Sequence, residues 1–355
     1  MKVGLVMGAG GVMGGAWITG GLEALARETG WDPASAEFIV GTSAGAMMGA
    51  LLAGGIPPWF MVAHSAGDDF EGFAGPDGRA AATADRSAGA RFTWHRGFPR
   101  LALGSPELIV HGLRNFRTTP PLGLLVGWGP QGMISTQPLK DVVRRVVPSG
   151  WADHPNLWLV AADYGTLERT VFGRAGSPDA DLADAVAAAC AIPNFYHPVK
   201  IGGRRYIDGG INSVSNLDLL ADEGLDLVIC LNPMTSLHRP RHLVARAGAA
   251  LRSRYGRQLG SEARLVREKG AKVVLIQPLG RDLAVMGPNY MSSKRRHEVI
   301  ETAIETVGAQ LRQPDVARLL KKLPPGLPHK VARPDLPVSR WREVMEIGGR
   351  ERRSA

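Results

Sequence analysis

Two strand, glycine turn and helix units follow each other within the first 55 residues, and they constrain the fold more than any other feature. Residues 2–7 form an apolar run with β-branched members, followed by a glycine-rich loop at 8–14 and a helical pattern over 16–27. Residues 37–40 are predicted to form a second short strand, which leads through a glycine turn into a helix over 44–52. This alternation predicts an α/β layered protein with a mostly parallel sheet.

Further strands and helices are predicted along the rest of the chain. Strands are expected over 157–162, 170–172, 206–210, 225–231 and 273–277, and an alanine-rich helix over 182–191 that Pro193 ends. We interpret 3–220 as a catalytic domain with an insertion at about 67–132, which is rich in Gly, Ala, Arg and Pro. Residues 221–311 then complete or cover the domain. A Pro/Arg-rich tail spans 312–355, and it is expected to pack poorly from Pro324 onward.

The charge is concentrated in the C-terminal third. Residues 237–355 carry 25 Lys or Arg residues against 11 Asp or Glu residues, whereas the whole chain has a net charge of +9. Such a region can attract anionic lipid headgroups, at about 1 kcal/mol for each cation near the surface. Non-specific contact with nucleic acid is a second interpretation, although no specific nucleic-acid binding is expected. An Arg-rich face exposed to solvent explains the same charge without any partner.

The cysteines and the apolar runs indicate the setting of the protein. Cys190 and Cys230 lie far apart and lack the spacing of metal ligands, so we expect no disulfide framework and no cysteine metal site. No run reaches the roughly 18 to 20 apolar residues that a membrane span needs. Only Lys2 supplies positive charge near the N-terminus and glycines interrupt the apolar stretch, which argues against a signal peptide. The expected location is the cytoplasm, with peripheral contact at a membrane as an extension.

The pentapeptide GTSAG at residues 41–45 has the G-x-S-x-G pattern of a serine nucleophile. A tight turn between a strand and a helix projects the serine hydroxyl toward substrate, and the flanking glycines let backbone pack closely around it. Ser43 is therefore the candidate nucleophile, supported by Gly41 and Gly45. The alternative is an ordinary glycine turn in which the serine only caps the following helix.

A serine nucleophile needs a base, and the best candidate is Asp208. In a Ser-His-Asp triad on an α/β sheet, a histidine is expected late in the chain, but His297 and His329 lie in charged or proline-rich segments. Asp208 ends a predicted strand and is followed by Gly209 and Gly210, so it can accept the serine proton directly. Its alternative role is an aspartate that only bonds the following turn.

The loop GAGGVMG at residues 8–14 can supply the third element of a hydrolase site. Backbone amides at a helix N-terminus stabilise the negative oxygen of a tetrahedral intermediate, and Gly10 and Gly11 are the expected donors, with Gly8 and Gly14 supporting the loop. A dinucleotide-binding loop is the rival interpretation. It requires an acidic residue at the end of the second strand, and Ser43 follows that strand instead.

Together, the glycine loop, GTSAG and the later DGG resemble the patatin-like phospholipase family. The likeness covers about 3–220 and includes the run AACAIPNFYHPVKIGGRRYIDGG at 188–210. It implies a three-layer α/β/α fold and a lipid acyl hydrolase that acts through a Ser-Asp dyad and an acyl-enzyme, without a metal or an organic cofactor. By position, it makes Ser43 the nucleophile and Asp208 the base, and it places Gly10 and Gly11 in the oxyanion hole.

Two departures from the family pattern lie in the glycine loop. Ala9 stands where the family usually has another glycine, and Met13 stands where it usually has arginine. Neither removes the nucleophile or the base. Two alternatives to a lipid hydrolase stay open. One is a catalytically silent lipid-binding module, for which Met13 is the hint. The other is an ester or thioester hydrolase or acyltransferase acting on a soluble substrate.

Aromatic residues of the insertion, together with the basic third, suit docking to a lipid surface. These aromatics are Phe70, Phe73, Phe92, Trp94, Phe98, Phe116 and Trp128.

Overall fold

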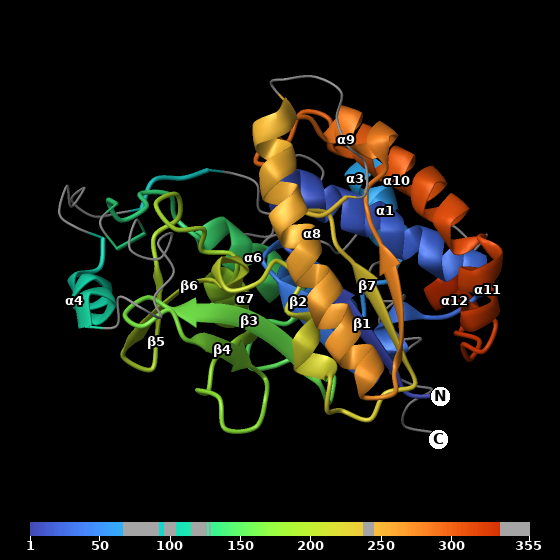
Figure 1. The fold of residues 1–355 in the computed structure, drawn as a ribbon, viewed down its shortest axis with the longest axis horizontal. Helices are drawn as coiled ribbons and strands as arrows, with labels where there is room; N and C mark the ends of the chain where they lie inside the picture. Colours follow the sequence, from blue (N-terminus) through green and yellow to red (C-terminus); the bar gives the residue numbers. More distant parts are fainter. Residues whose placement is uncertain (67–91, 96–103, 115–125, 128, 237–244, 334–355) are drawn as a thin grey trace.

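A single mixed sheet forms the centre of the protein in a computed structural model (Figure 1). The structure describes residues 1–66, 92–95, 104–114, 126–127, 129–236 and 245–333. Within these residues the strands are β1 (Val3–Met7), β2 (Phe38–Thr42), β3 (Leu157–Asp163), β4 (Arg169–Phe172), β5 (Val199–Ile201), β6 (Arg204–Asp208), β7 (Leu227–Leu231) and β8 (Lys272–Ile276). Their order is β5-β6-β3-β2-β1-β7-β8, and β4 also pairs with β3.

The centre of the sheet is parallel and one edge is antiparallel. β1 pairs in parallel with β2 and β7, β2 pairs with β3, and β7 pairs with β8. β4 and β6 run antiparallel to β3, and β5 closes a hairpin with β6. Since parallel strands end at the same edge of a sheet, the residues that follow β1 and β2 meet there.

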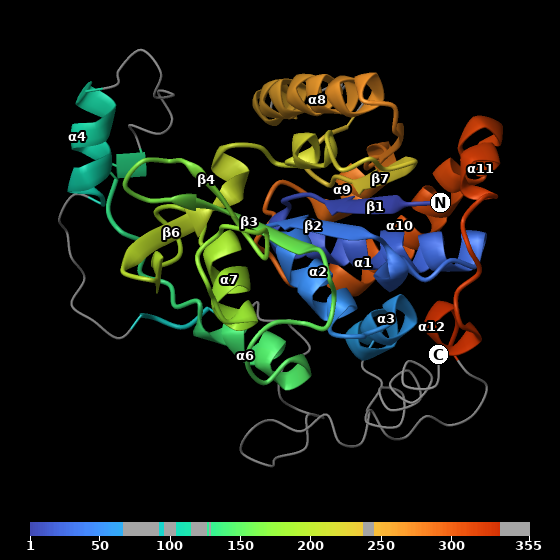
Figure 2. The ribbon, with the colours of Figure 1, turned by 90° about the horizontal axis from the view of Figure 1, so that it is seen from below.

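Helices cover both faces of the sheet, as predicted for a three-layer α/β/α fold. Figure 2 shows α8 (Ala245–Glu268) on one face and α1 (Gly11–Thr29), α2 (Ala44–Ala53) and α3 (Pro58–Ala66) on the other. The other helices are α4 (Pro106–Arg114), α6 (Gln137–Val146), α7 (Leu182–Ala189), α9 (Gly280–Met286), α10 (Arg296–Leu311), α11 (Pro314–Leu320) and α12 (Pro328–Val331).

Side-chain alternation along the central strands divides the core in two. Leu5 and Met7 of β1 belong to the large cluster on the side of α1, whereas Val6 faces the cluster on the side of α8. In α8, Leu259 and Ala263 are four residues apart and both are buried against this second cluster. Strand β1 is thus buried on both faces, which explains its continuous apolar run.

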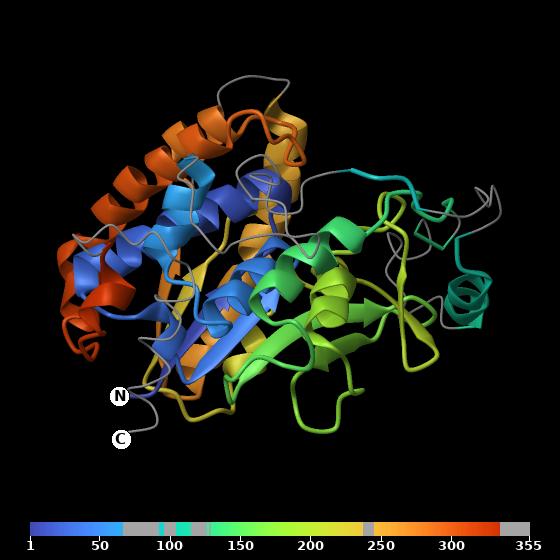
Figure 3. The same ribbon diagram turned by 180° about the vertical axis from the view of Figure 1, so that it is seen from behind.

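Helix α10 packs along α1 and adds an outer element to the first layer (Figure 3). The approach is close at Gly20 of α1, because a Cβ atom there would lie 2.8 Å from the Cβ of Ala303 and would overlap the backbone of Ile300. Glycine at this position lets the two helix backbones approach each other. A region outside the similarity at 3–220 therefore belongs to the core.

The C-terminal segment corrects one expectation. The prolines after Pro324 predicted poor packing, but the structure docks α12 onto α3 and the loop before it. Lys330 Nζ donates to the Gly55 carbonyl at 2.8 Å, and Trp59 Nε1 donates to the His329 carbonyl at 2.9 Å. Proline at the start of a helix is compatible with helix geometry, so the proline of α12 begins a helical turn rather than preventing one. Residues 334–355 lie outside the described part.

Much of the predicted insertion also lies outside the described residues, including Phe70, Phe73, Phe98, Phe116 and Trp128. In the described segments of the insertion, α4 is helical, and Trp94 forms an isolated antiparallel bridge with Ile134, just beyond the predicted end of the insertion.

No single helix in the described segments is long and apolar enough to cross a bilayer; α2 and α3 meet the length and composition test only as a pair bent by 116°.

Candidate active site

Ser43 lies in a strained turn between β2 and α2. Its backbone has φ 53° and ψ −119°, a left-handed region that costs a non-glycine residue about 1 to 3 kcal/mol. Gly41 and Gly45 flank it, and a Cβ atom on Gly45 would overlap the carbonyl oxygen of Met7. The Ser43 side chain makes no capping hydrogen bond to α2, which argues against the helix-cap interpretation. The glycines on both sides of Ser43 therefore allow the tight turn that presents its hydroxyl.

Asp208 ends β6 and reaches the same hydroxyl. Its side chain accepts a hydrogen bond from the Gly210 amide at 2.7 Å, and its own amide donates to Ala191. Burial raises the pKa of Asp208 from 3.8 to about 6, while the nearby Ser43 hydroxyl and the hydrogen bond from the Gly210 amide counteract part of that rise. The two residues, 165 positions apart in sequence, thus lie next to each other.

The glycine loop lies beside this pair. The Gly8 carbonyl accepts from the Gly45 amide at 3.1 Å, and the Ala9 amide donates to the Val214 carbonyl at 2.8 Å. Gly10 is the N-cap of α1, and its carbonyl accepts the Gly14 amide at 2.8 Å. Gly11 begins the helix at φ 59°, a conformation that favours glycine.

The Gly10 and Gly11 amides are available for an external acceptor. Neither donates a hydrogen bond to another of the described residues, and Gly11 lines the same pocket as Ser43. Both stand at the N-terminus of the 19-residue helix α1, where partial positive charge accumulates. This position suits a developing oxyanion.

The two departures in the loop are accommodated structurally. The Ala9 amide is already used on Val214, and Ala9 does not take a positive φ, so a methyl group fits. The Met13 side chain is 2% exposed and packs in the large core cluster, while its amide donates to the Tyr290 carbonyl at 3.0 Å. Met13 is therefore a core residue here.

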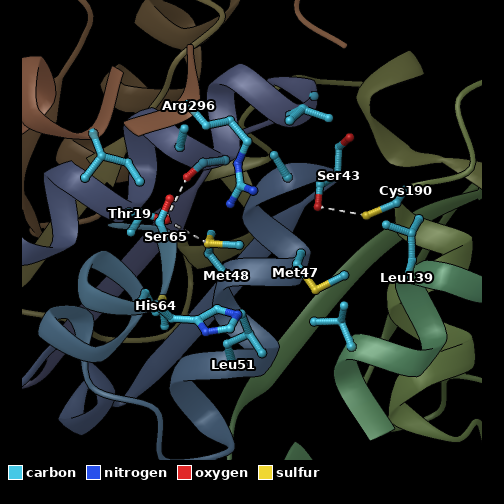
Figure 4. Close-up of a pocket in the computed structure, with 18 of the residues that line it drawn as sticks. Thr19, Ser43, Met47, Met48, Leu51, His64, Ser65, Leu139, Cys190 and Arg296 are labelled. Carbon is cyan, nitrogen blue, oxygen red and sulfur yellow. Dashed lines mark hydrogen bonds between the residues drawn. The ribbon is translucent and has the colours of Figure 1, made fainter. Parts of the chain in front are cut away.

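The pocket at Ser43 is mainly apolar (Figure 4). It encloses about 1100 Å³ of space between atoms, including its solvent-open part. Its lining includes Met47, Met48 and Leu51 along α2. His64 of α3 also lines it, but Figure 4 shows this ring beside Leu51 rather than at Ser43. A long apolar group extending from the hydroxyl fits such a lining.

Cys190 is a pocket residue that the sequence did not single out. Its thiol donates to the Ser43 carbonyl at 3.1 Å. Burial raises the pKa of Cys190 well above its usual value, and the negative charge of Asp208 raises it further. The thiol is therefore neutral and serves to hold the turn, since only the thiolate is a strong nucleophile.

Glu262 of α8 organises the segment that follows Asp208, and it was also missed. Its carboxylate accepts from the hydroxyls of Ser213 and Ser215, each at 2.6 Å, and from the Leu217 amide at 3.0 Å. Burial is the main cause that raises its pKa.

Asn216 connects this segment to the nucleophile turn. Its Nδ2 donates to Thr42 Oγ1 at 2.9 Å and to the Ser213 carbonyl at 2.7 Å. A buried, satisfied polar network of this kind fixes one geometry. The available sequence signal was a glutamate in a helix whose other charged residues are mainly arginines.

His297 and His329, the histidines weighed for a triad, do not line the pocket; His297 pairs with Glu301 at 3.1 Å. Among the described residues, no group of three or more His, Cys, Asp or Glu side chains could hold a metal ion.

The fold and the pocket define an α/β protein with a buried serine and carboxylate beside a helix N-terminus. The chain belongs to the patatin-like phospholipase family, whose profile matches residues 5–221, more than half of the sequence. This match supports a function of the lipid acyl hydrolase kind.

Proposed function

We propose that the protein hydrolyses acyl esters of lipids, of the phospholipase A or lysophospholipase kind, through a Ser43-Asp208 dyad. The observation that carries this proposal is the proximity of the two buried side chains beside an apolar pocket. The family match supports the class of reaction.

The arrangement accounts for both halves of an ester hydrolysis. Ser43 Oγ attacks the acyl carbonyl carbon while its proton passes to the Asp208 carboxylate, and the Gly10 and Gly11 amides hold the carbonyl oxygen as it becomes negative. The C–O bond to the leaving alcohol then breaks, and Asp208 returns the proton to that oxygen. Water attacks the acyl-enzyme in the same way, which releases the fatty acid and restores Ser43.

The raised pKa of Asp208 suits this role. A carboxyl with a pKa of about 6 is ionised near neutral pH yet basic enough to hold a proton during the reaction. Its raised pKa also indicates a desolvated site, in which oxyanion donors act more strongly than in water.

Covalent labelling tests the assignment of Ser43. A fluorophosphonate should label the wild-type protein, and Ser43→Ala should lose both the label and fatty-acid release. Ser65→Ala is the matched control, since Ser65 lines the same pocket and this variant should label normally. A well-folded wild-type protein that takes no label would instead favour a silent lipid-binding module.

We also propose that the face around Trp94 docks onto a lipid surface. Trp94 is 70% exposed, Phe92 and Met133 are exposed beside it, and Ile134, which bridges Trp94, also bridges the pocket residue Tyr196. Trp94→Ala should lower binding to phosphatidylcholine vesicles with little dependence on salt. Unchanged binding would contradict this contact.

A further inference from the structure

The pocket at Ser43 continues along α2 to a second end that the proposed reaction does not use. Ser43, Met47 and Leu51 line the pocket in succession along this helix, as Figure 4 shows. A rise of about 1.5 Å per residue puts Leu51 about 12 Å from Ser43 along the helix axis. Ile56, whose amide donates to the Leu51 carbonyl at 3.0 Å, lines the pocket there as well. We call the part of the pocket at Leu51 and Ile56 its far end.

Helix α6 forms a second wall of the pocket, and this wall begins near Ser43. Leu139, Val142 and Arg145 are spaced three residues apart, so they share one face of α6, and all three line the pocket. Figure 4 shows Leu139 next to Cys190, whose thiol donates to the Ser43 carbonyl at 3.1 Å. The first turn of α6 therefore lies at the Ser43 end.

The last turn of α6 lies at the far end. A Cβ atom on Gly54, the C-cap of α2, would overlap the Val146 side chain, so the two helices end beside each other. Arg145 precedes Val146 in this turn and lines the pocket. Long side chains of a helix lean toward its N-terminus, so Arg145 leans back along the pocket in the direction of Ser43. The α6 wall thus carries apolar side chains near Ser43 and a cation beyond them.

Arg145 brings a donor to the far end that the described residues leave unpaired. Its Nε is buried without a hydrogen-bond partner among them. Two other cations of α6, Lys140 and Arg144, pair with Asp184 at 2.7 and 3.8 Å. The described residues that line the pocket include no Asp or Glu. A buried donor without an acceptor is costly, and in a pocket it indicates a ligand that supplies the acceptor.

We infer that Arg145 binds a carboxylate at the end of the acyl chain, opposite the ester. This inference rests on the proposed function, which puts the ester at Ser43. A guanidinium presents a planar fork of donors that matches the two oxygens of a carboxylate, and the apolar walls before it suit a methylene chain. The preferred substrates are then esters of dicarboxylic acids rather than of ordinary fatty acids.

The geometry also sets the length of the preferred acyl chain. A fully extended chain advances about 3.5 Å over three bonds, so about ten bonds span the 12 Å between Ser43 and the far end. An acyl chain of about ten carbons therefore brings its terminal carboxylate to Arg145, whereas a chain of about six carbons ends too early.

Glycerol monoesters of decanedioic acid and decanoic acid test the inference with the full-length protein in neutral detergent micelles. Near neutral pH the terminal carboxylate of the first ester is ionised, and the second ester lacks it. Arg145→Gln should lower the ratio of the two kcat/KM values, decanedioyl over decanoyl, about tenfold or more. A ratio that does not change would overturn the inference. Esters of hexanedioic and tetradecanedioic acid should show a smaller effect, and an equal effect at all lengths would contradict a site at a fixed distance.

Arg144→Gln is the matched control, because Arg144 is the preceding residue of α6, carries the same charge and does not line the pocket. This variant should leave the ratio of the two esters unchanged. Arg145→Lys keeps a positive charge and should retain part of the preference for the decanedioyl ester. A ratio that falls equally in Arg144→Gln and Arg145→Gln would show a general charge effect and contradict a specific site.

A binding measurement separates this inference from the proposed hydrolysis. The mono-N-methylamide of decanedioic acid replaces the ester with an amide, and calorimetry can follow its binding to Ser43→Ala protein, with N-methyldecanamide as the reference compound. Adding Arg145→Gln should weaken binding of the acid about tenfold or more and change binding of the reference by less than about threefold. If the wild-type protein hydrolyses no ester but this loss is seen, the proposed function fails and the carboxylate site stands. If the acid binds equally with and without Arg145, the carboxylate site fails.

Discussion

Asp208 and Glu262 are both buried carboxylates with raised pKa values, yet their surroundings differ. Glu262 accepts three hydrogen bonds within 3.0 Å from the segment 213–217, so its oxygens are occupied by the protein itself. Asp208 accepts one hydrogen bond from the Gly210 amide. Its other polar neighbour is Ser43, which lines an open pocket. Burial and a serine partner therefore do not by themselves mark a candidate catalytic carboxylate; a serine partner that lines an open pocket does.

The difference also separates the two faces of the sheet. The side of α1 carries the pocket and a strained turn at Ser43, whereas the side of α8 carries a satisfied polar network. One region carries the candidate reactive site, and the other supports the segment next to it.

The largest effect is expected from Asp208→Asn, which keeps the shape of the side chain but removes the base. Ester hydrolysis should fall about a thousandfold or more, because the Ser43 proton has no acceptor. In the wild type, kcat/KM should fall as pH drops below about 6, where Asp208 becomes protonated. Steady-state rates between pH 4 and 8 check both points. A wild-type profile flat through pH 6 would contradict Asp208 as the base.

Glu262→Ala should affect the stability of the fold more than the chemistry at Ser43. It leaves the hydroxyls of Ser213 and Ser215 and the Leu217 amide without their acceptor, which should lower the free energy of unfolding by about 3 to 4 kcal/mol. Urea unfolding measures it, and Glu268→Ala, an exposed position on the same helix, should change it by less than about 0.5 kcal/mol. Equal losses of unfolding free energy in the two variants would contradict a structural role of Glu262.

A smaller effect is expected on the free energy of unfolding: Asp208→Asn should stabilise the protein at pH 7. A folded-state pKa of about 6 against the usual 3.8 means that the native state binds this proton more tightly than the unfolded chain. Stability of the wild type therefore falls as pH rises from about 4 to 6, by about 2 to 3 kcal/mol, and the variant avoids that loss. Unfolding at pH 4 and pH 7 tests it. A variant no more stable than the wild type at pH 7 would show that burying the ionised Asp208 does not lower the stability of the folded state by this amount.

What the sequence could predict was local. GTSAG lies at a predicted junction of a strand, a turn and a helix. The strands β1, β3 and β7 were predicted from their runs of apolar residues alone. The pairing of Ser43 with Asp208 was accessible through the resemblance. The geometry now brings these side chains into contact, while their catalytic roles remain a proposal.

The rest depended on tertiary contacts. Glu262 sits in α8, whose charged residues are mainly arginines, and its neighbours along the chain do not identify the buried partners Ser213 and Ser215. Helix α1 begins at Gly11, earlier than the pattern from residue 16 suggested. Its first turn contains two glycines, which have poor helix propensity, and contacts with the segment 290–291 hold this turn in place. In the same way, α12 is stabilised by its contacts with the region around α3.

The pairing of β1 with β7 has a consequence for engineering. The recognisable family segment stops at residue 221, but β7, β8 and α10 come after it. A fragment cut at that boundary would present the bare hydrogen-bonding edge of β1 and the uncovered apolar flank of α1 to water, an arrangement prone to intermolecular strand addition. Transplants, chimaeras and crystallisation fragments of this enzyme class should accordingly retain the chain through α12.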